Sequence, residues 1–331
     1  MRIGASPRVI VRKNRGMERD WERAHEFFAM PPAAIEARLH AALPEARVTA
    51  ARPLAAGLRN TNYRLEIEGG PSPLVLRLYV ADPEACPREA AVLARVAGRV
   101  PAPRVVHSSP ASNPPFALLC WLDGWPLDQV LRDCDDASAL QLAAACGTAL
   151  TAVHKTRFPA PGFFGPDATV VRPMPAWAPT VISTLDGPAG ERLGPRLATK
   201  IRHAVESNAP MVEVAWSDAV LVHGDFKPWN LLARRRAGGW RLTGVLDWEF
   251  ACAGSKLLDF ATFLRDEAGR PPGFGAAFAD AYRSAGGQLP EEWRGLTRLI
   301  DLLNLMQMLE WSGEQANEDI IRLTVGTLGA V

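Results

Sequence analysis

The chain has 331 residues with a formal net charge of +1, and hydrophobic residues make up 48% of it. A chain of this length exceeds one ordinary hydrophobic core, which predicts two lobes or domains that can enclose a cleft. The small net charge gives no electrostatic footprint for nucleic acid or for an anionic membrane, so neither is expected as a partner.

Cysteine spacing and hydropathy indicate the compartment. Five cysteines are scattered without paired spacing, which favours neither a zinc cluster nor a disulfide framework. No run of about 18 uninterrupted apolar residues is present, and residues 1–23 lack the apolar core of a secretory signal. We therefore expect a cytoplasmic protein, and the sequence carries no signal for an oligomeric state.

The first part of the chain alternates short apolar or branched runs with turn residues. Residues 1–30 are predicted to form a loosely ordered N-terminal extension, and Pro31-Pro32 then opens a helix at residues 33–42. A small sheet with one further helix should follow, in a lobe that spans residues 31–121. Its strands are expected at residues 47–54, 62–68, 73–80, 104–107 and 116–122, and its helix at residues 87–96.

The second part of the chain, residues 122–331, is predicted to be a larger and mostly helical lobe. One hairpin interrupts it, because residues 231–236 and 240–246 look like strands joined at Ala237-Gly238-Gly239. The order of a small sheet followed by many helices indicates an α+β fold.

The most informative segment is HGDFKPWN at residues 223–230, which is followed seventeen residues after its Asn by the triplet DWE at residues 247–249. Transfer of a γ-phosphoryl group needs a carboxylate beside the attacking hydroxyl and oxygen ligands that hold Mg²⁺ on the phosphates. Asp225 is predicted to orient the hydroxyl and to accept its proton as catalytic base. Asn230 and Asp247 are predicted to bind Mg²⁺, since amide and carboxylate oxygens suit this ion and the hairpin brings them together.

Two alternatives accompany this motif. Glu249 either contacts the metal or its waters, or it lies behind the metal ligands or in solvent. The whole segment has a plainer interpretation as a surface hairpin after a Gly-Asp turn, because Asp and Asn are ordinary turn residues. The complete set of residues in their structural context favours the phosphoryl-transfer site.

The segment resembles the catalytic core of the aminoglycoside phosphotransferase and choline kinase family, which has the eukaryotic protein-kinase-like fold. In that family the loop reads His-Gly-Asp, four variable residues and Asn, and a later Asp-x-Glu or similar triplet carries the second metal ligand. The resemblance covers roughly residues 35 to 310. It implies a bilobal fold, with a small antiparallel sheet lobe containing one helix before a larger helical lobe.

The resemblance also implies the nucleotide contacts of the small lobe. Residues 57–63 look like the nucleotide loop of the family, where Gly57 and Asn60 would approach the phosphates. Arg77 occupies the place where kinases usually have a phosphate-binding lysine, and Glu89 would pair with it. The alternative is an outward-facing Arg77 and a solvated Glu89.

Further positions follow from the same resemblance. Residues 116–124 look like the hinge between the lobes, with Cys120 and Leu122 beside the adenine or guanine base. Lys227 lies two residues past the catalytic base and would reach the transferring phosphate. Three residues are expected to be structural, and Asp259 among them would cap an apolar helix. These structural residues are His154, His223 and Asp259.

The C-terminal region bears on the identity of the acceptor. Residues 290–319 hold seven acidic side chains against two basic ones. This composition indicates either a pocket for a cationic small molecule, covered by Trp293 or Trp311, or a solvated helix face above buried tryptophans.

Together, the residues and the resemblance predict an ATP- or GTP-dependent and Mg²⁺-dependent phosphotransferase. It would move the γ-phosphate to a hydroxyl of a small molecule, either an aminoglycoside-like antibiotic or an amino-alcohol or sugar metabolite. The alternative is a catalytically silent pseudokinase that binds nucleotide or a partner, which the arginine at position 77 suggests.

Overall fold

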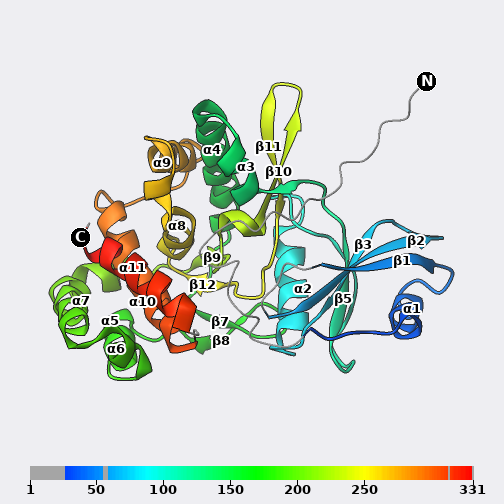
Figure 1. Ribbon diagram of the computed structural model, residues 1–331, viewed down its shortest axis with the longest axis horizontal. Coiled ribbons are helices and arrows are strands. Elements are labelled where there is room, and N and C mark those ends of the chain that lie inside the picture. The colour runs from blue at the N-terminus through cyan, green and yellow to red at the C-terminus, as the bar shows by residue number, and fades with distance from the viewer. Residues whose placement is uncertain (1–26, 55–58, 312–313, 330–331) are drawn as a thin grey trace.

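A five-stranded antiparallel sheet forms the N-terminal lobe, at the right of Figure 1. The computed structural model describes residues 27–54, 59–311 and 314–329, so most of the predicted N-terminal extension and Gly57 lie outside the described residues. The strand order in the sheet is β1-β2-β3-β5-β4. The elements of this lobe are α1 (Pro32–His40), β1 (Arg47–Leu54), β2 (Thr61–Glu68), β3 (Leu74–Leu78), α2 (Ala85–Val96), β4 (Val105–Ser109) and β5 (Phe116–Cys120). All seven predicted elements are therefore confirmed within two residues at each end.

The two faces of this sheet serve different cores, because successive side chains of a strand point to opposite faces. Leu76 and Leu118 face a small core that also contains Ile35 of α1. Ala117 and Leu119 belong to the large core on the other face, which includes residues of α2. The helix α2 thus lies between the sheet and the C-terminal lobe (Figure 1).

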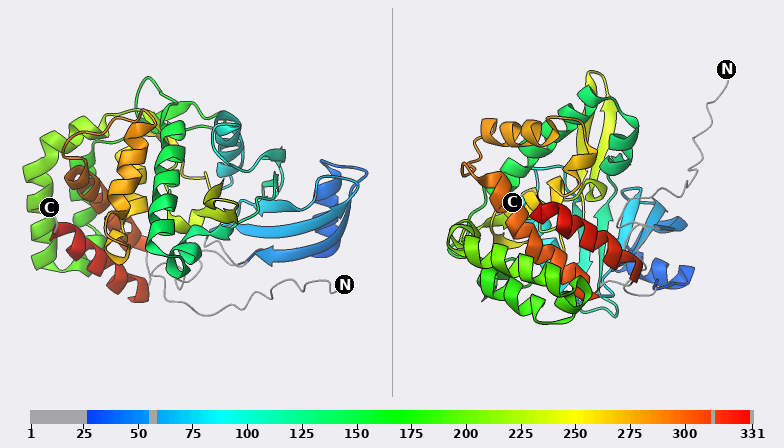
Figure 2. Two further views of the ribbon diagram at one scale, coloured as in Figure 1. Left: turned by 90° about the horizontal axis from the view of Figure 1, so that it is seen from above. Right: turned by 60° about the vertical axis from the view of Figure 1, so that its left-hand side comes forward.

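The C-terminal lobe is mainly helical, as predicted. The long helix α4 packs against α9, and α10 packs against α8 (Figure 2). Its helices are α3 (Leu127–Asp133), α4 (Asp136–His154), α5 (Trp177–Leu185), α6 (Pro188–Leu193), α7 (Pro195–Trp216), α8 (Leu257–Leu264), α9 (Phe274–Ser284), α10 (Trp293–Trp311) and α11 (Glu314–Leu328). Among the helices of the described residues, none combines the length and the apolar character that a membrane span requires.

The C-terminal lobe also contains strands that the sequence analysis missed. A four-stranded sheet has the order β8-β7-β12-β9, and β6 (Trp125–Pro126) adds a third strand to the predicted hairpin. Strands of two to four residues are too short to show the alternation by which a strand is recognised. The four strands of the missed sheet are β7 (Gly162–Phe164), β8 (Val170–Pro173), β9 (Val220–Val222) and β12 (Cys252–Gly254).

Two strand pairs position the HGD segment and the DWE triplet. In the predicted hairpin, β10 (Leu231–Arg236) pairs with β11 (Gly239–Val245), and Leu231 lies opposite Val245. In the missed sheet, β9 ends immediately before His223 and pairs with β12, which follows the triplet. The strands that flank the HGDFKPWN segment, β9 and β10, therefore pair with the strands that flank the DWE triplet, β12 and β11.

Candidate active site

The turn at Gly224 directs the catalytic loop. Its φ is +82°, a conformation that side chains rarely adopt, and a Cβ atom there would lie 2.4 Å from the carbonyl oxygen of Phe250. Only glycine meets both conditions without displacing the backbone of residue 250. The turn leads directly to Asp225.

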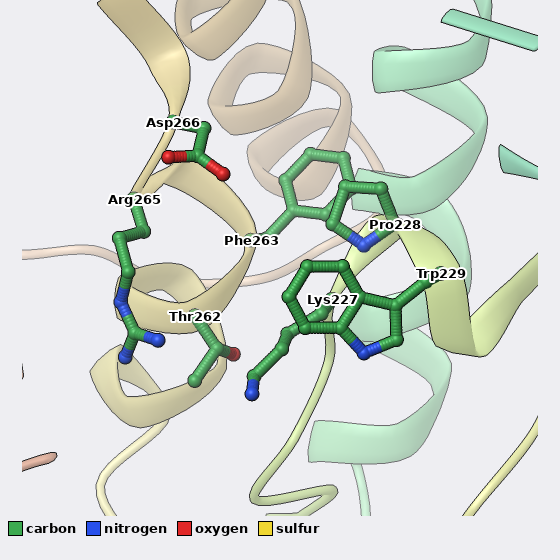
Figure 3. Close-up of a pocket in the computed structure, with 7 residues that line it drawn as sticks. All are labelled: Lys227, Pro228, Trp229, Thr262, Phe263, Arg265 and Asp266. Atoms are coloured by element: carbon green, nitrogen blue, oxygen red, sulfur yellow. The ribbon is translucent and has the colours of Figure 1, made fainter. Parts of the chain in front are cut away.

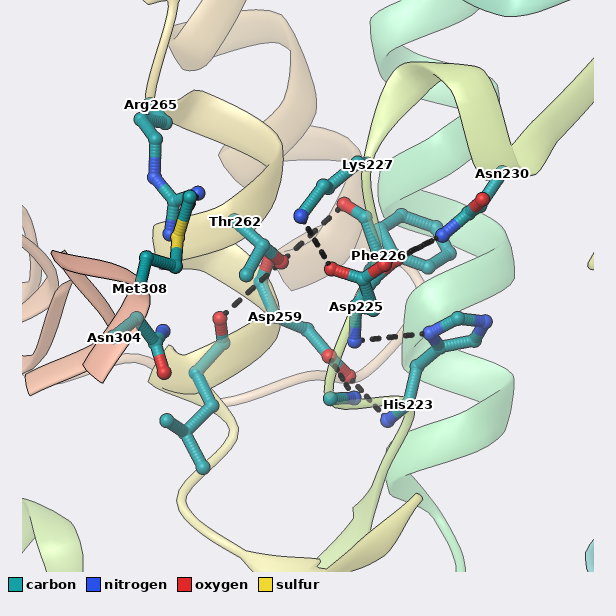
Figure 4. Close-up of polar contacts among 12 residues, drawn as sticks. His223, Asp225, Phe226, Lys227, Asn230, Asp259, Thr262, Arg265, Asn304 and Met308 are labelled. Atoms are coloured by element: carbon teal, nitrogen blue, oxygen red, sulfur yellow. Dashed lines mark hydrogen bonds and ion pairs between the residues drawn. The ribbon is translucent and has the colours of Figure 1, made fainter. Parts of the chain in front are cut away.

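Asp225 is held through both carboxylate oxygens (Figure 4). Its Oδ1 lies 2.8 Å from the Lys227 ammonium, and its Oδ2 accepts a hydrogen bond of 2.8 Å from the Asn230 side-chain amide. The same amide nitrogen also donates to the Asp225 carbonyl at 3.0 Å. Because the nitrogen of Asn230 is committed to Asp225, its amide oxygen is the atom that can bind a cation.

His223 supports the loop rather than acting in proton transfer. Its side chain is fully buried, and its Nδ1 accepts a hydrogen bond of 3.2 Å from the backbone N–H of Asp225. Nδ1 therefore carries no proton, and Nε2 donates to the Leu246 carbonyl at 2.9 Å. The structural role that the resemblance implied for His223 matches this geometry.

Asp259 anchors the loop from below. The carboxylate is fully buried and accepts hydrogen bonds of 2.8 Å from the backbone N–H groups of both His223 and Gly224. His154 lies 3.1 Å from the same carboxylate through Nε2, and its Nδ1 lies 3.0 Å from the Tyr282 hydroxyl. The predicted helix-capping role of Asp259 is wrong, because α8 begins at Leu257 and the carboxylate turns away to the loop.

Arg77 faces the site and not the solvent. Its side chain is 9% exposed, its Nε lies 3.0 Å from the Glu89 carboxylate, and its Nη2 is ion-paired with Asp247. Burial alone would lower the pKa of Arg77, but the negative charges of Glu89, Asp247 and Glu249 outweigh it and raise the pKa well above its usual value. The expected pairing with Glu89 is present, and the outward orientation is wrong.

Glu89 ties three parts of the molecule together. Besides Arg77, it accepts hydrogen bonds from the Tyr79 hydroxyl at 2.6 Å and from the backbone N–H of Trp248 at 2.9 Å. Trp248 stands between Asp247 and Glu249, so α2 of the small lobe is bonded directly to the DWE triplet of the large lobe. This contact fixes the triplet relative to Arg77.

Asp247 has a backbone conformation that suits few residues. Its φ is +67°, in the left-handed region that Asp and Asn tolerate better than most non-glycine residues. The backbone N–H of the preceding residue, Leu246, donates to the Asn230 carbonyl at 2.8 Å. The two side chains predicted to bind metal thus come from segments that are in direct contact.

Glu249 is buried beside the nucleotide loop. Its side chain accepts a hydrogen bond of 2.8 Å from Asn60, and the Arg59 and Arg77 guanidinium groups each approach it to 3.8 Å. Burial, and next the charge of Asp247, raise the pKa of Glu249 to about 7. The solvated alternative for Glu249 is therefore wrong. The hydrogen bond also places Asn60 beside the DWE triplet, although Asn60 and Glu249 are 189 residues apart in the sequence.

The raised pKa of Glu249 predicts a pH-dependent stability of the protein without nucleotide or metal. A carboxyl group whose pKa is higher in the folded state binds more protons when folded, so its contribution favours folding at low pH. This contribution should decline as the pH rises from the unfolded pKa near 4.5 to the folded pKa of about 7. Urea unfolding of Glu249→Gln beside the wild type should show a flatter dependence across this window; parallel pH profiles would contradict the prediction.

The donor set of the site fits Mg²⁺. The Asn230 amide oxygen and the Asp247 and Glu249 carboxylates are hard oxygen ligands, which this ion prefers. Asp247 is the most accessible of these carboxylates, since 29% of its side chain is exposed against 4% for Glu249. The arrangement therefore offers Asn230 and Asp247 as direct ligands, with Glu249 behind them.

The predicted hinge residues lie at the end of the small sheet. Cys120 ends β5, and its backbone N–H donates to the Arg104 carbonyl at 2.9 Å. Leu122 follows this strand and is half-buried. Their contacts with a nucleotide base stay a prediction.

A pocket opens beside the catalytic loop, between that loop and the end of α8 (Figure 3). It is lined by Lys227, Pro228, Trp229, Thr262, Phe263, Arg265 and Asp266. Lys227 takes part in both the pocket and the contact with Asp225, so this pocket borders the predicted base.

No acidic side chain that the structure describes between residues 290 and 319 lines this pocket. Asp301 forms an ion pair of 2.6 Å with Arg265, and Asp319 pairs with Arg322. Trp293 is 5% exposed and packs edge-to-face against Phe260. The Arg294 guanidinium already lies 4.6 Å from the centroid of the Trp293 ring, so the predicted role of Trp293 over a cationic acceptor is not supported. The side chain of Trp311 lies outside the described residues.

Several residues near the site were missed by sequence reasoning. Arg59, Tyr79 and Arg265 carry no motif of their own, and their contacts depend on long-range packing. A weak signal was available for Arg59, which adjoins Asn60 in the nucleotide loop, and its guanidinium lies 5.2 Å from the Phe250 ring centroid.

Comparisons with known proteins show the family of the chain. A sequence model of the phosphotransferase enzyme family matches residues 50–296. Homoserine kinase of Rhodospirillum rubrum is 26% identical over 229 residues, which cover 66% of this chain and 64% of that protein. The chain thus spans somewhat less than two thirds of the length of this relative.

Solved structures show the same fold. A crystal structure of aminoglycoside phosphotransferase APH(4)-Ia aligns with a TM-score of 0.64 and 18% identity, over 91% of this chain and 98% of that one. The GDP and kanamycin complex of APH(2")-IIia aligns with a TM-score of 0.68 and 15% identity, over 90% of this chain and 99% of that one.

The bilobal fold and the loop built around Asp225 define a kinase-like phosphotransferase. The chain belongs to the phosphotransferase enzyme family.

Proposed function

We propose that the enzyme transfers the γ-phosphate of ATP or GTP to a hydroxyl of a small molecule, with Asp225 as catalytic base. The observation that carries this proposal is the position of the Asp225 carboxylate, which is fixed by Lys227 and Asn230 beside the small pocket that Lys227 also lines. A carboxylate held in one orientation can align an acceptor hydroxyl and take its proton.

The surrounding residues would bind the nucleotide phosphates. Arg77 is held by Glu89, and its planar guanidinium can bind phosphate oxygens in two-point contacts. Lys227 would neutralise charge on the transferring group, since its ammonium already lies beside the base. Asn60, held by Glu249, would approach the phosphates from the nucleotide loop.

Asn230 and Asp247, with Glu249 behind them, would hold Mg²⁺. When bound, this ion bridges the phosphates and stabilises the negative charge that develops on them. The bound nucleotides of related structures are AMP-PNP with APH(4)-Ia and GDP with APH(2")-IIia. Both ATP and GTP are therefore candidate phosphate donors, and Cys120 and Leu122 are the proposed neighbours of the adenine or guanine base. The five unpaired cysteines agree with a cytoplasmic location.

The direct test is magnesium-dependent transfer of labelled γ-phosphate from ATP and from GTP. The acceptor panel should hold aminoglycosides, choline, amino alcohols, sugars and L-homoserine, because relatives act on or bind compounds of two of these kinds. Labelled product that disappears in Asp225→Asn would support the proposal. Nucleotide binding without transfer to any acceptor would favour the pseudokinase instead.

Replacing Asp247 by asparagine should weaken binding of the nucleotide in the presence of magnesium. Asparagine tolerates the left-handed backbone at this position, so the fold should persist while one charged ligand is lost. Thermal unfolding with and without Mg²⁺ and nucleotide measures this, since a ligand at 100 times its Kd stabilises by ~2.7 kcal/mol. The Asp186→Asn variant, changed at an exposed ion pair, should behave as the wild type. An unchanged magnesium-dependent shift in Asp247→Asn would exclude Asp247 as a ligand.

A further inference from the structure

Arg59 lies where the two lobes meet, two residues before β2 and beside the DWE triplet. Its Nε lies 3.8 Å from Oε1 of Glu249, and its guanidinium lies 5.2 Å from the centroid of the Phe250 ring. The backbone of Phe250 in turn packs against Gly224, the residue before Asp225. Arg59 therefore stands close to both the metal-binding triplet and the catalytic loop.

The guanidinium of Arg59 has donors available for a ligand. It donates no hydrogen bond to any residue that the structure describes, and its Nε is buried without a hydrogen-bond partner. The contact of 3.8 Å with Glu249 is too long for a hydrogen bond. Glu249 is also shared, since Asn60 donates to its other oxygen at 2.8 Å and Arg77 approaches the same Oε1 to 3.8 Å. Because 41% of its side chain is exposed, Arg59 can turn toward a bound anion without breaking a hydrogen bond.

Arg77, in contrast, is already committed. Its Nε and Nη2 are ion-paired with Glu89 and Asp247, and only 9% of its side chain is exposed. Arg77 can offer Nη1 to a phosphate, but it cannot leave these carboxylates without exposing them to each other as unpaired charges. The two arginines are therefore unequal, because Arg77 holds the triplet in place while Arg59 keeps its donors available.

The terminal phosphate of a nucleotide would lie where these segments meet. In-line transfer requires that phosphate between the acceptor hydroxyl, at Asp225, and the metal, at Asp247. Arg59 flanks this place, because it approaches Glu249 and packs on Phe250 beside the catalytic loop. The carboxylates of the triplet would repel a phosphate, and the positive charge of Arg59 would offset that repulsion.

We propose that Arg59 binds the terminal phosphate of the nucleotide and stabilises the charge that develops on it during transfer. This inference rests on the proposed function and adds a catalytic residue to it. In the reaction, the acceptor oxygen bonds to the γ-phosphorus and the bond from that phosphorus to the β–γ bridging oxygen breaks. The hydroxyl proton passes to Asp225, and the nucleoside diphosphate leaves. Arg59 donates hydrogen bonds to the oxygens of the transferring group and takes no part in the proton transfer.

Binding of triphosphate and diphosphate nucleotides tests this assignment without an acceptor. In the presence of Mg²⁺, Arg59→Met should raise the Kd of AMP-PNP about tenfold or more, the scale of one charge-assisted contact, and leave the Kd of ADP within about twofold. The same measurements with GMP-PNP and GDP cover a preference for guanine. Arg59→Lys should keep part of the affinity for AMP-PNP, because it retains the charge but loses the planar two-point contact. Calorimetry measures each Kd.

The matched control is Arg172→Met. Arg172 also lies over an aromatic ring, with its guanidinium 4.0 Å from the centroid of Phe163. It is on β8, at the opposite edge of the sheet from β9, so both Kd values should stay unchanged. An equal rise in the Kd of AMP-PNP and of ADP in Arg59→Met would show that Arg59 only shapes the loop. An unchanged Kd of AMP-PNP would show that Arg59 does not reach the γ-phosphate. Either result would overturn the assignment.

These outcomes separate the inference from the function on which it rests. Transfer of labelled phosphate that requires Asp225 but proceeds in Arg59→Met with the kcat and nucleotide KM of the wild type would refute the role of Arg59 and keep the kinase. A selective loss of AMP-PNP affinity in Arg59→Met, together with full transfer in Asp225→Asn, would support Arg59 and refute the assigned base.

Discussion

Asparagine in place of Asp225 is expected to lower kcat by a factor of about 10² to 10⁴, which is the usual contribution of a positioned general base. The substitution keeps the size and shape of the side chain but removes the carboxylate that would accept the hydroxyl proton. Nucleotide binding should persist, because the proposed phosphate and metal ligands are other residues. Single-turnover transfer of labelled phosphate measures the loss directly, and a nucleotide-dependent thermal shift measures the retained binding.

The fold should tolerate this change. The oxygen of the new amide can accept from Asn230 as Oδ2 of Asp225 does, but its NH₂ group then faces the Lys227 ammonium in place of an ion pair. The expected loss of stability is about 1 kcal/mol, the scale of one partly exposed polar contact. Asp280→Asn, at an exposed pair on α9, serves as the control for both activity and stability. Activity of Asp225→Asn within twofold of the wild type would remove Asp225 from the mechanism.

The sequence predicted the parts of this site that depend on local structure. Asp225 and Asn230 share one loop, and a hairpin with a Gly-Gly turn returns the chain to Asp247, so their proximity follows from spacing alone. The five strands of the small sheet were also recognisable, since most of them are long enough to show apolar alternation or clustering.

Other parts of the site required long-range packing. Asn60 meets Glu249, and Arg77 meets Asp247, only because the two lobes are packed together. The short strands β9 and β12 likewise pair across a wide gap in the chain, and neither has a recognisable pattern. Arg265 and Asp301 lie 36 residues apart and share no motif, and the packing of α8 against α10 makes them a buried pair.

Asp259 shows how a residue that contacts no reactant can still determine the site. We expect Asp259→Asn to lower the free energy of unfolding by about 3 kcal/mol, the scale of breaking a buried charged network. Oδ1 accepts from Gly224 and Oδ2 accepts from His223, so an NH₂ group in either position would face a backbone N–H donor. No rotation of the amide avoids this conflict. Urea unfolding measures this change: the urea concentration at the midpoint should fall, while the dependence of the unfolding free energy on urea concentration stays the same.

The same substitution should reduce kcat beyond the effect of unfolding. The two backbone N–H groups that Asp259 holds belong to the residues directly before Asp225, so their release lets the base leave its contacts with Lys227 and Asn230. A misplacement of the base by about 1 Å can cost about 10²-fold in rate. Asp280→Asn should change neither quantity. If Asp259→Asn had the stability and the kcat of the wild type, the buried carboxylate would be dispensable. The loop would then be held by the contact of His223 with Leu246 alone.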